Sequence, residues 1–115
     1  MPVSVAASGS QTATLTTEHT LVTQAGPTGG AVYQLRVDSA NLANGETLTL
    51  ALRTRARSGD TTRTIYTAVF TNVQGDPIKD SPAIAVPVSN ETMVTLKQDG
   101  GTGRAFPWAL MRLDG

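Results

Sequence analysis

The chain has 115 residues, no cysteine, and nine basic and nine acidic side chains, so its formal net charge is zero. This length supports one domain with a single core. The lack of cysteine excludes a disulfide framework and a thiolate metal site. Zero net charge provides no global attraction to nucleic acid or to an anionic membrane. No apolar run approaches the roughly 18 residues that span a bilayer, and the first residues lack a signal-peptide pattern. We therefore expect synthesis in a cytoplasm, with neither nucleic acid nor membrane as a partner.

The first segment, residues 1–11, contains small, uncharged side chains, and the first charged residue is Glu18. Such a segment buries too little apolar surface to become ordered by itself. The sequence therefore predicts a flexible N-terminal arm over residues 1–11. This arm is either frayed or becomes ordered against a neighbouring subunit, for example as an added strand. Residues 12–115 are expected to form a single β domain.

About seven segments of the remaining chain alternate apolar and polar residues with period two, which is typical of half-buried strands. Clusters of Gly, Pro, Asn and Asp separate them and indicate turns, with Asn44-Gly45 the clearest tight turn. The expected strands are Thr12–Thr17 with Thr20–Gln24 (one strand with a bend), Ala31–Val37, Thr47–Arg57, Thr64–Asn72, Ala83–Val88, Glu91–Gln98 and Arg104–Leu113.

The alternation also predicts which side chains face the core. Leu48, Leu50 and Leu52 should point inward from one strand. Apolar residues of both parities in Thr64–Asn72 suggest a strand buried on both faces, whereas Pro87 suggests an edge strand. The glycine-rich stretch at residues 99–103 is expected to close a hairpin. The predicted fold class is all-β: an antiparallel β-sandwich or jelly-roll-like barrel of seven to eight strands, with an extended N-terminal arm.

Candidate residues for chemistry are few. His19 is the single histidine, and its neighbour Glu18 would point to the opposite face of a strand, so a catalytic triad has no support. Most acids lie in expected turns, where they cap local backbone. Asp76 with Asp80, or Asp99 beside glycines, lack the dense alternation of a calcium loop. The sequence therefore predicts no catalytic residue, no metal site and no cofactor.

Two sets of side chains remain as candidates for binding. Arg53, Arg55 and Arg57 alternate along one strand, with Arg63 across the following turn, and are expected to form a basic stripe. The stripe is either a solvated face or a docking surface for an acidic protein. Nucleic acid is disfavoured because no aromatic residues interleave with the arginines. The second set is Phe106 and Trp108, which are expected to be core anchors. An exposed sugar-binding platform is the alternative.

Two longer segments carry a resemblance to a known family. They are VDSANLANGETLTLALRTR, from residue 37, and VTLKQDGGTGRAFPWALMRL, from residue 94. The first is similar to an Asp-Ser/Leu-x-Asn-Leu-x-x-Gly-Asp/Glu-Thr turn before a long strand, and the second to a closing Val-Thr-Leu-Lys-Gln…Gly-Thr…Phe-Pro-Trp segment. Both patterns occur in small head proteins of tailed bacteriophages. The resemblance covers most of the chain from Ala31 onward and is weaker over Met1–Thr28.

This resemblance implies a structural virion protein that is not an enzyme. It would be a capsid decoration or cement protein, made in the host cytoplasm and bound to the outside of the capsid shell. The implied partner is the major capsid protein, and the implied oligomer is a homotrimer. No site residue carries over, because the matching positions are turn and packing positions. The alternatives are a phage tail or baseplate component, and a carbohydrate-binding or host-adhesion β-sandwich.

Overall fold

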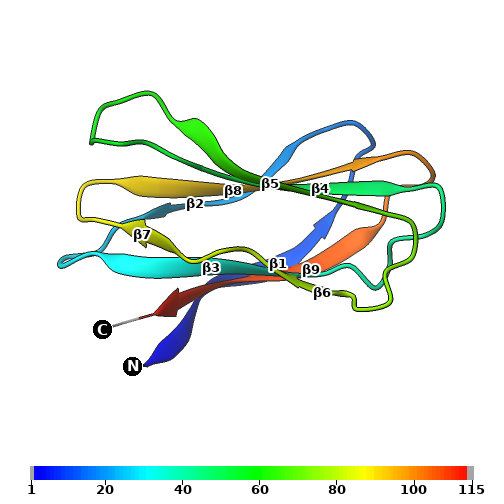
Figure 1. Ribbon diagram of the computed structural model, residues 1–115, viewed down its shortest axis with the longest axis horizontal. Coiled ribbons are helices and arrows are strands. Elements are labelled where there is room, and N and C mark those ends of the chain that lie inside the picture. Colours follow the sequence, from blue (N-terminus) through cyan, green and yellow to red (C-terminus); the bar gives the residue numbers. More distant parts are fainter. Residues whose placement is uncertain (1, 114–115) are drawn as a thin grey trace.

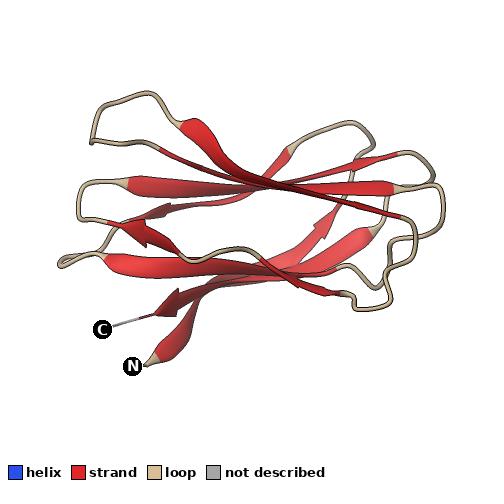
Figure 2. Ribbon diagram, viewed as in Figure 1, coloured by secondary structure: helices blue, strands red, loops and turns tan. Residues whose placement is uncertain are grey.

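The computed structural model describes residues 2–113 and shows nine antiparallel strands in two packed sheets, with no helix in this range (Figures 1 and 2). The predicted all-β class and the sandwich are therefore confirmed, with more strands than the seven to eight expected. Sheet A contains β1 (Val3–Thr12), β9 (Ala105–Leu113), β3 (Ala31–Asp38), β6 (Ile78–Asp80) and β7 (Ile84–Val86). Sheet B contains β2 (His19–Ala25), β8 (Glu91–Asp99), β4 (Thr47–Thr54) and β5 (Arg63–Thr71).

The edge strand β5 of sheet B and the short edge strands β6 and β7 of sheet A lie on the same side of the sandwich (Figure 1). Sheet A runs β1-β9-β3-β6, with β7 also paired to β3, and sheet B runs β2-β8-β4-β5. Figure 1 shows the two layers from the side that carries β5 and the short strands β6 and β7. The Lys79 ammonium lies 4.9 Å from the centre of the Phe70 ring and connects the two sheets at this edge.

The core lies between the two sheets and follows the predicted alternation. Leu48, Leu50 and Leu52 of β4 are 0–5% exposed, as the sequence predicted. They face residues of β3 and β9 that are equally buried, and Phe106 of β9 is fully buried. Because a strand places alternate residues on opposite faces, these inward side chains form one continuous apolar layer. The buried apolar residues that form this core are Ala13, Tyr33, Leu35, Val37, Leu42, Leu48, Leu50, Leu52, Val86, Val94, Leu96, Phe106 and Leu110.

The predicted arm is instead an ordered strand of this domain over its described residues. β1 pairs antiparallel with β9 along its whole length, from Val3 opposite Leu113 to Thr12 opposite Ala105. Its side chains are nevertheless mostly exposed, and Val3 and Val5 are each 61% exposed. Because β1 buries little apolar surface, its backbone pairing with β9 is what holds the strand in the sheet. The boundary expected at residue 11 falls inside this strand, and Met1 lies outside the described residues.

Three further predictions about strands are wrong. β5 is an edge strand and is not buried on both faces, because β4 is its neighbour on one side and Ile65 and Val69 are 52% and 59% exposed. The turn at residues 99–103 does not close a hairpin, since β8 belongs to sheet B and β9 to sheet A. The stretch between the expected strands Thr64–Asn72 and Ala83–Val88, which was given no strand, contains the short strand β6. The edge position predicted from Pro87 is confirmed for β7, which pairs with β3.

A buried carboxylate joins the two segments that carry the family resemblance. Glu46 precedes β4 and is 1% exposed, and its two carboxylate oxygens accept hydrogen bonds from the Ala43 and Thr102 amides at 2.9 and 3.2 Å. The Arg104 guanidinium binds the same carboxylate, with Nη2 2.9 Å from Oε2. Gly101 has φ +65°, and a Cβ there would collide with the Glu46 carboxylate. Glycine is therefore required at this position.

The side chain of Gln98 completes this arrangement, which we call the Glu46 cluster (Glu46, Gln98, Thr102 and Arg104). Gln98 is fully buried and donates to the Thr102 carbonyl at 2.7 Å. Its Oε1 accepts the Arg104 amide at 2.9 Å. The polar groups of the cluster are thus paired across the connection between the two sheets, as buried polar groups must be. The resemblance motifs therefore act as parts of the fold.

An exposed ion pair between the strands of sheet A provides a contrast. Arg36 of β3 and Asp80 of β6 form two hydrogen bonds of 2.7 and 2.9 Å, and Asp80 has a 36% exposed side chain. Arg36 holds the pKa of the Asp80 carboxyl below its usual value. Because solvent screens exposed pairs, we expect Asp80→Asn to reduce the free energy of unfolding by no more than about 1 kcal/mol. Urea denaturation of both proteins measures this difference, and a loss several times larger would contradict the prediction.

Candidate functional site: an arginine-lined hollow

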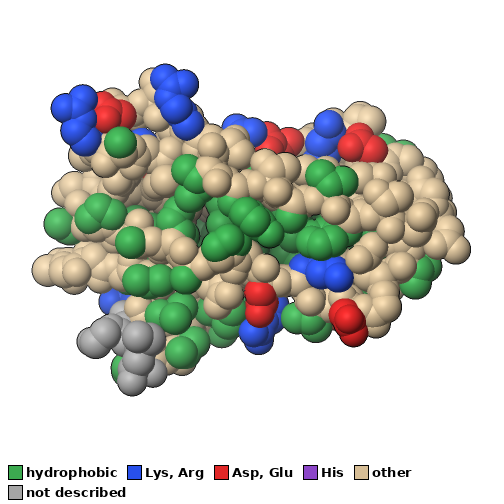
Figure 3. Space-filling view, viewed as in Figure 1, with side chains coloured by type: hydrophobic (Ala, Val, Ile, Leu, Met, Phe, Trp, Pro, Cys, Tyr) green, Lys and Arg blue, Asp and Glu red, His purple; other side chains and the backbone are tan. Residues whose placement is uncertain are grey.

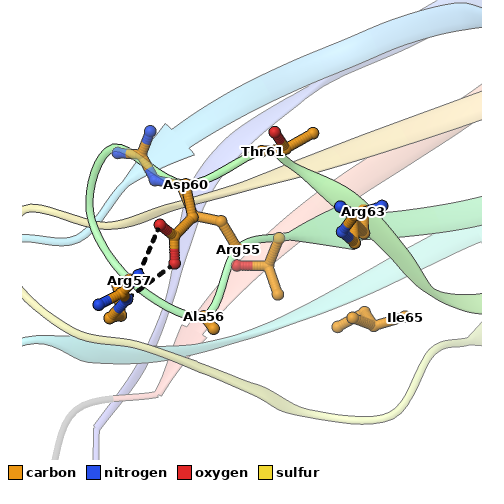
Figure 4. Close-up of a pocket in the computed structure, with 8 residues that line it drawn as sticks. Arg55, Ala56, Arg57, Asp60, Thr61, Arg63 and Ile65 are labelled. Carbon is orange, nitrogen blue, oxygen red and sulfur yellow. Dashed lines mark hydrogen bonds and ion pairs between the residues drawn. The ribbon is translucent and has the colours of Figure 1, made fainter.

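A hollow of about 520 Å³ lies at the loop between β4 and β5, and it is the candidate binding site (Figure 4). The loop turns at Ser58-Gly59-Asp60, with the Asp60 amide donating to the Arg57 carbonyl. Gly59 has φ +88°, which glycine adopts without strain. The turn brings the end of β4 and the start of β5 together around the hollow. Its lining residues are Thr54, Arg55, Ala56, Arg57, Asp60, Thr61, Arg63 and Ile65.

Arg55 is the fixed arginine of the hollow. Its Nε donates to Asn90 Oδ1 at 3.1 Å and its Nη2 to the Ser89 carbonyl at 3.3 Å. Glu91 lies 3.6 Å from Nη1, and the Asn90 side chain donates in return to the Arg55 carbonyl at 2.9 Å. These contacts join the β4–β5 loop to the turn between β7 and β8. Arg55 therefore provides a rigid wall of the hollow.

Arg57 and Arg63 are the accessible arginines. The Arg57 side chain is 83% exposed, and its guanidinium pairs within the loop with Asp60 at 3.0 Å (Figure 4). Arg63 begins β5, is exposed, and has no side-chain hydrogen bond or ion pair within residues 2–113. An exposed local pair contributes little to stability, so Arg57 can exchange Asp60 for another carboxylate at small cost. Both guanidinia are thus available to a ligand.

The predicted stripe of four arginines is divided by a β-bulge. The register between β4 and β5 shifts at Leu52/Arg53, and a bulge redirects the side chains around it. Arg53 lies on the outer face of sheet B, where its Nη2 contacts both oxygens of the Glu18 carboxylate at 2.9 Å. It lines a separate depression that none of the other three arginines lines. The structure therefore brings together Arg55, Arg57 and Arg63 and leaves Arg53 apart.

The hollow is suited to an anionic partner. Three guanidinia and one carboxylate line it, which leaves an excess of positive charge. Arginine presents planar donors that bind a carboxylate with two parallel hydrogen bonds. Ala56 and Ile65 add an apolar part to the lining. This arrangement can bind an acidic side chain together with an apolar neighbour.

The two candidate core anchors differ in their burial. Phe106 is fully buried in the core, as predicted. Trp108 is half-buried and packs against the core, and it is paired with Gly9 of β1. A Cβ at Gly9 would lie 3.4 Å from the Trp108 indole nitrogen, so the ring covers this glycine closely. Trp108 therefore packs within the sandwich and does not form an exposed platform for sugars.

Most of the remaining polar candidates have structural contacts. His19 Nε2 accepts the Thr14 amide at 2.9 Å, whereas Glu18 binds Arg53 and the Thr95 hydroxyl. The two neighbours thus have separate partners. Of the acids considered and rejected as calcium ligands, Asp80 is held by Arg36 and Asp99 lies 3.9 Å from Lys97. Asp76 has no ion pair or side-chain hydrogen bond within residues 2–113. No group of three or more potential metal ligands occurs within residues 2–113.

Comparisons with family models, with curated proteins and with solved structures gave no match to this chain. The resemblance to phage head proteins therefore depends on the two sequence motifs. In the structure these motifs are joined by the Glu46–Arg104 pair. Over residues 2–113, no helix is long and apolar enough to cross a membrane.

The partners that shape the hollow were not identified from the sequence. Asn90 and Glu91 fix Arg55 from more than thirty residues away in the chain, and no local pattern indicates this contact. The sequence places Asp60 among the acids of expected turns and does not indicate its pairing with Arg57. Its spacing of three residues from Arg57 was the one local signal, because the two residues flank a tight turn.

Proposed function

We propose that this protein is a capsid decoration protein of a tailed bacteriophage, which binds the outside of the shell formed by the major capsid protein. The proposed docking site is the arginine-lined hollow, and the proposed contact on the shell is acidic. In this function the protein is a binding module without a catalytic step. Its location is the capsid surface of the virion.

One observation carries the docking proposal: Arg63 is a charged side chain without an ionic partner within residues 2–113, beside the exposed Arg57. Both arginines lie in a hollow whose third arginine, Arg55, is fixed by side-chain contacts. Complementary charges across an interface increase the rate of association and fix its register. The sandwich provides the rigid support that such a site needs.

Stabilisation of the shell would follow from mass action. A protein that binds an assembled shell more tightly than its separate subunits shifts the equilibrium toward assembly. Many copies on one shell add their contributions. The two sequence motifs that resemble head proteins support this setting over a tail or adhesion function, and the packed position of Trp108 gives no support to sugar binding.

The test is co-sedimentation with shells that lack the protein. We expect saturable binding by the native protein, and at least a tenfold weaker affinity for Arg57→Gln/Arg63→Gln, because two charge-assisted contacts are lost. The control variant is Arg36→Gln/Lys97→Gln, which removes the same charge from outside the hollow. Binding of the native protein should also weaken as salt is raised.

Two results would contradict the proposal. Absence of the native protein from sedimented shells would reject the decoration function. Equal loss of affinity in both double variants would reject the hollow as the docking site, because net charge alone would then explain the effect.

A further inference from the structure

The outer edge of β5 is an open strand edge with no strand neighbour within residues 2–113. Every second residue of such a strand turns its backbone N–H and C=O groups away from the sheet. These groups form a template for another strand. Hydrophobic side chains also gather in a band between the two layers on the side that carries β5 (Figure 3). Tyr66 and Phe70 of β5 belong to the partly buried residues that pack on the core there.

The other edges of the sandwich carry features that discourage pairing. β6 and β7 have three residues each and are flanked by prolines. β1 and β2 each contain a register irregularity, between Val5 and Ala7 and between Thr20 and Val22. The pairing of β5 with β4 also shifts once, between Thr64 and Tyr66, but it is continuous from Tyr66 to Thr71, and this stretch has no charge and no proline. The continuous stretch of β1, residues 7–12, carries only small or polar side chains, whereas that of β5 carries Tyr66, Val69 and Phe70. Short length, proline and bulges are common means of protecting an edge, and this stretch of β5 lacks them.

The side chains of β5 are complementary to those of a second, antiparallel β5. When two copies pair about Ala68, Tyr66 of each copy lies opposite Phe70 of the other. On the outer face Thr67 lies opposite Val69, which is 59% exposed in the single chain. Thr67 belongs to this face because it lines a depression with Thr49, the register partner of Val69. Aromatic and β-branched cross-strand pairs stabilise such a ladder.

Opposite charges at the two ends of β5 favour the same arrangement. Arg63 begins the strand, and Asp76 lies in the turn that follows it. Within residues 2–113 neither side chain has an ion pair or a hydrogen bond. Antiparallel pairing places the start of one β5 beside the end of the other. Arg63 of each copy then lies at the same end of the ribbon as Asp76 of the second copy.

We infer that two copies of this chain associate through antiparallel pairing of their β5 strands about Ala68. Sheet B of each copy then continues into sheet B of the other. The contact has two-fold symmetry and is closed, because the same strand serves on both sides. It builds a dimer, whereas the family resemblance implies a trimer. The inference concerns the protein alone and does not depend on its binding to a capsid.

The test is the mass of the purified protein in solution as a function of concentration. We expect a dimer for the native chain. In Thr67→Lys/Val69→Lys, position 67 of each copy lies opposite position 69 of the other, so the dimer contains two lysine–lysine pairs. The dimer dissociation constant should therefore rise roughly tenfold or more. In Thr67→Lys/Val69→Glu, the same positions form Lys–Glu pairs across the two-fold axis, and the dimer should be restored. Both positions are exposed, so each variant should keep the fold.

The control Ser8→Lys/Ser10→Lys places the same charges on β1 and should leave the dimer intact. A native monomer or trimer at all concentrations would overturn the inference. A Lys/Lys variant that remains dimeric would exclude β5 as the contact. A Lys/Glu variant that stays monomeric would exclude the register about Ala68. If Thr67→Lys/Val69→Lys fails to fold, the masses of the native protein and of Thr67→Lys/Val69→Glu still show whether the chain dimerises through β5.

Discussion

Replacement of Glu46 by glutamine is expected to lower the free energy of unfolding by about 2 to 4 kcal/mol, because a buried charge-assisted network loses its acceptor charge. Glu46 accepts hydrogen bonds from two backbone amides and from Arg104. Glutamine has one acceptor oxygen, and its NH₂ group would face a donor. Denaturant unfolding at neutral pH, followed by the fluorescence of the single tryptophan, measures the loss.

The same variant should change the dependence of stability on pH. Hydrogen bonds from Arg104 are the main cause that lowers the Glu46 pKa to about 2, against about 4.3 for an unperturbed glutamate. A lowered folded-state pKa means that this stabilisation is fully present above the unfolded-state pKa. It is lost as pH falls from about 5 toward 2. The native protein should therefore lose stability across this range, and Glu46→Gln should show a flatter profile.

Asp80→Asn is the matched control for this experiment, because it removes an exposed carboxylate that also binds an arginine. It should cause a small loss and leave most of the acid dependence in place. Equal losses of stability in the Glu46 and Asp80 variants, or a native pH profile in both, would show that the buried Glu46 cluster contributes no more to stability than the exposed Arg36–Asp80 pair.

Truncation of Phe106 is expected to have a comparable or larger effect. Phe106→Ala should reduce the free energy of unfolding by about 3 to 5 kcal/mol, because it removes buried apolar area and leaves a cavity. Small domains have total stabilities of roughly 5 to 15 kcal/mol, so this loss is a large part of the whole. Phe106→Leu should cost less and should remain folded enough for measurement. Denaturant midpoints of the three proteins provide the comparison.

Val69→Ala is the control for Phe106, since Val69 is 59% exposed and substitutions of mostly exposed side chains usually change stability little. We expect a change within about 0.5 kcal/mol at low protein concentration. A small effect of Phe106→Ala would mean that the core relaxes around the missing ring. That result would contradict its assignment as a core anchor.

The parts of the fold that were predictable from the sequence are those encoded by local alternation. Leu48, Leu50 and Leu52 are buried in the predicted phase, and the turn at Asn44-Gly45 is present. The connection between β8 and β9 was predicted wrongly because a tight hairpin and a crossing between sheets use the same residue types. Glycines permit both, and the choice depends on which strands pair over long distances.

The strand β1 shows a second limit of local patterns. Its side chains are small and exposed, so they carry little hydrophobic signal. Its order comes from backbone hydrogen bonds to β9, about one hundred residues later in the sequence. In the arginine site the limit is similar, because the β-bulge at Arg53 and the contacts of Arg55 depend on distant segments. The sequence therefore indicates which residues are candidates for the site, but not which of them the fold brings together.

The pairing of Val3 with Leu113 has a practical consequence for engineering. The two ends of the described chain leave the sandwich side by side, at the far end of sheet A from the Glu46 cluster. A peptide fused to either end would emerge at the same place, and a short linker could join the ends into a ring. New ends could then be opened in an exposed turn, which would move the point of attachment for cargo without changing the order of strands in either sheet.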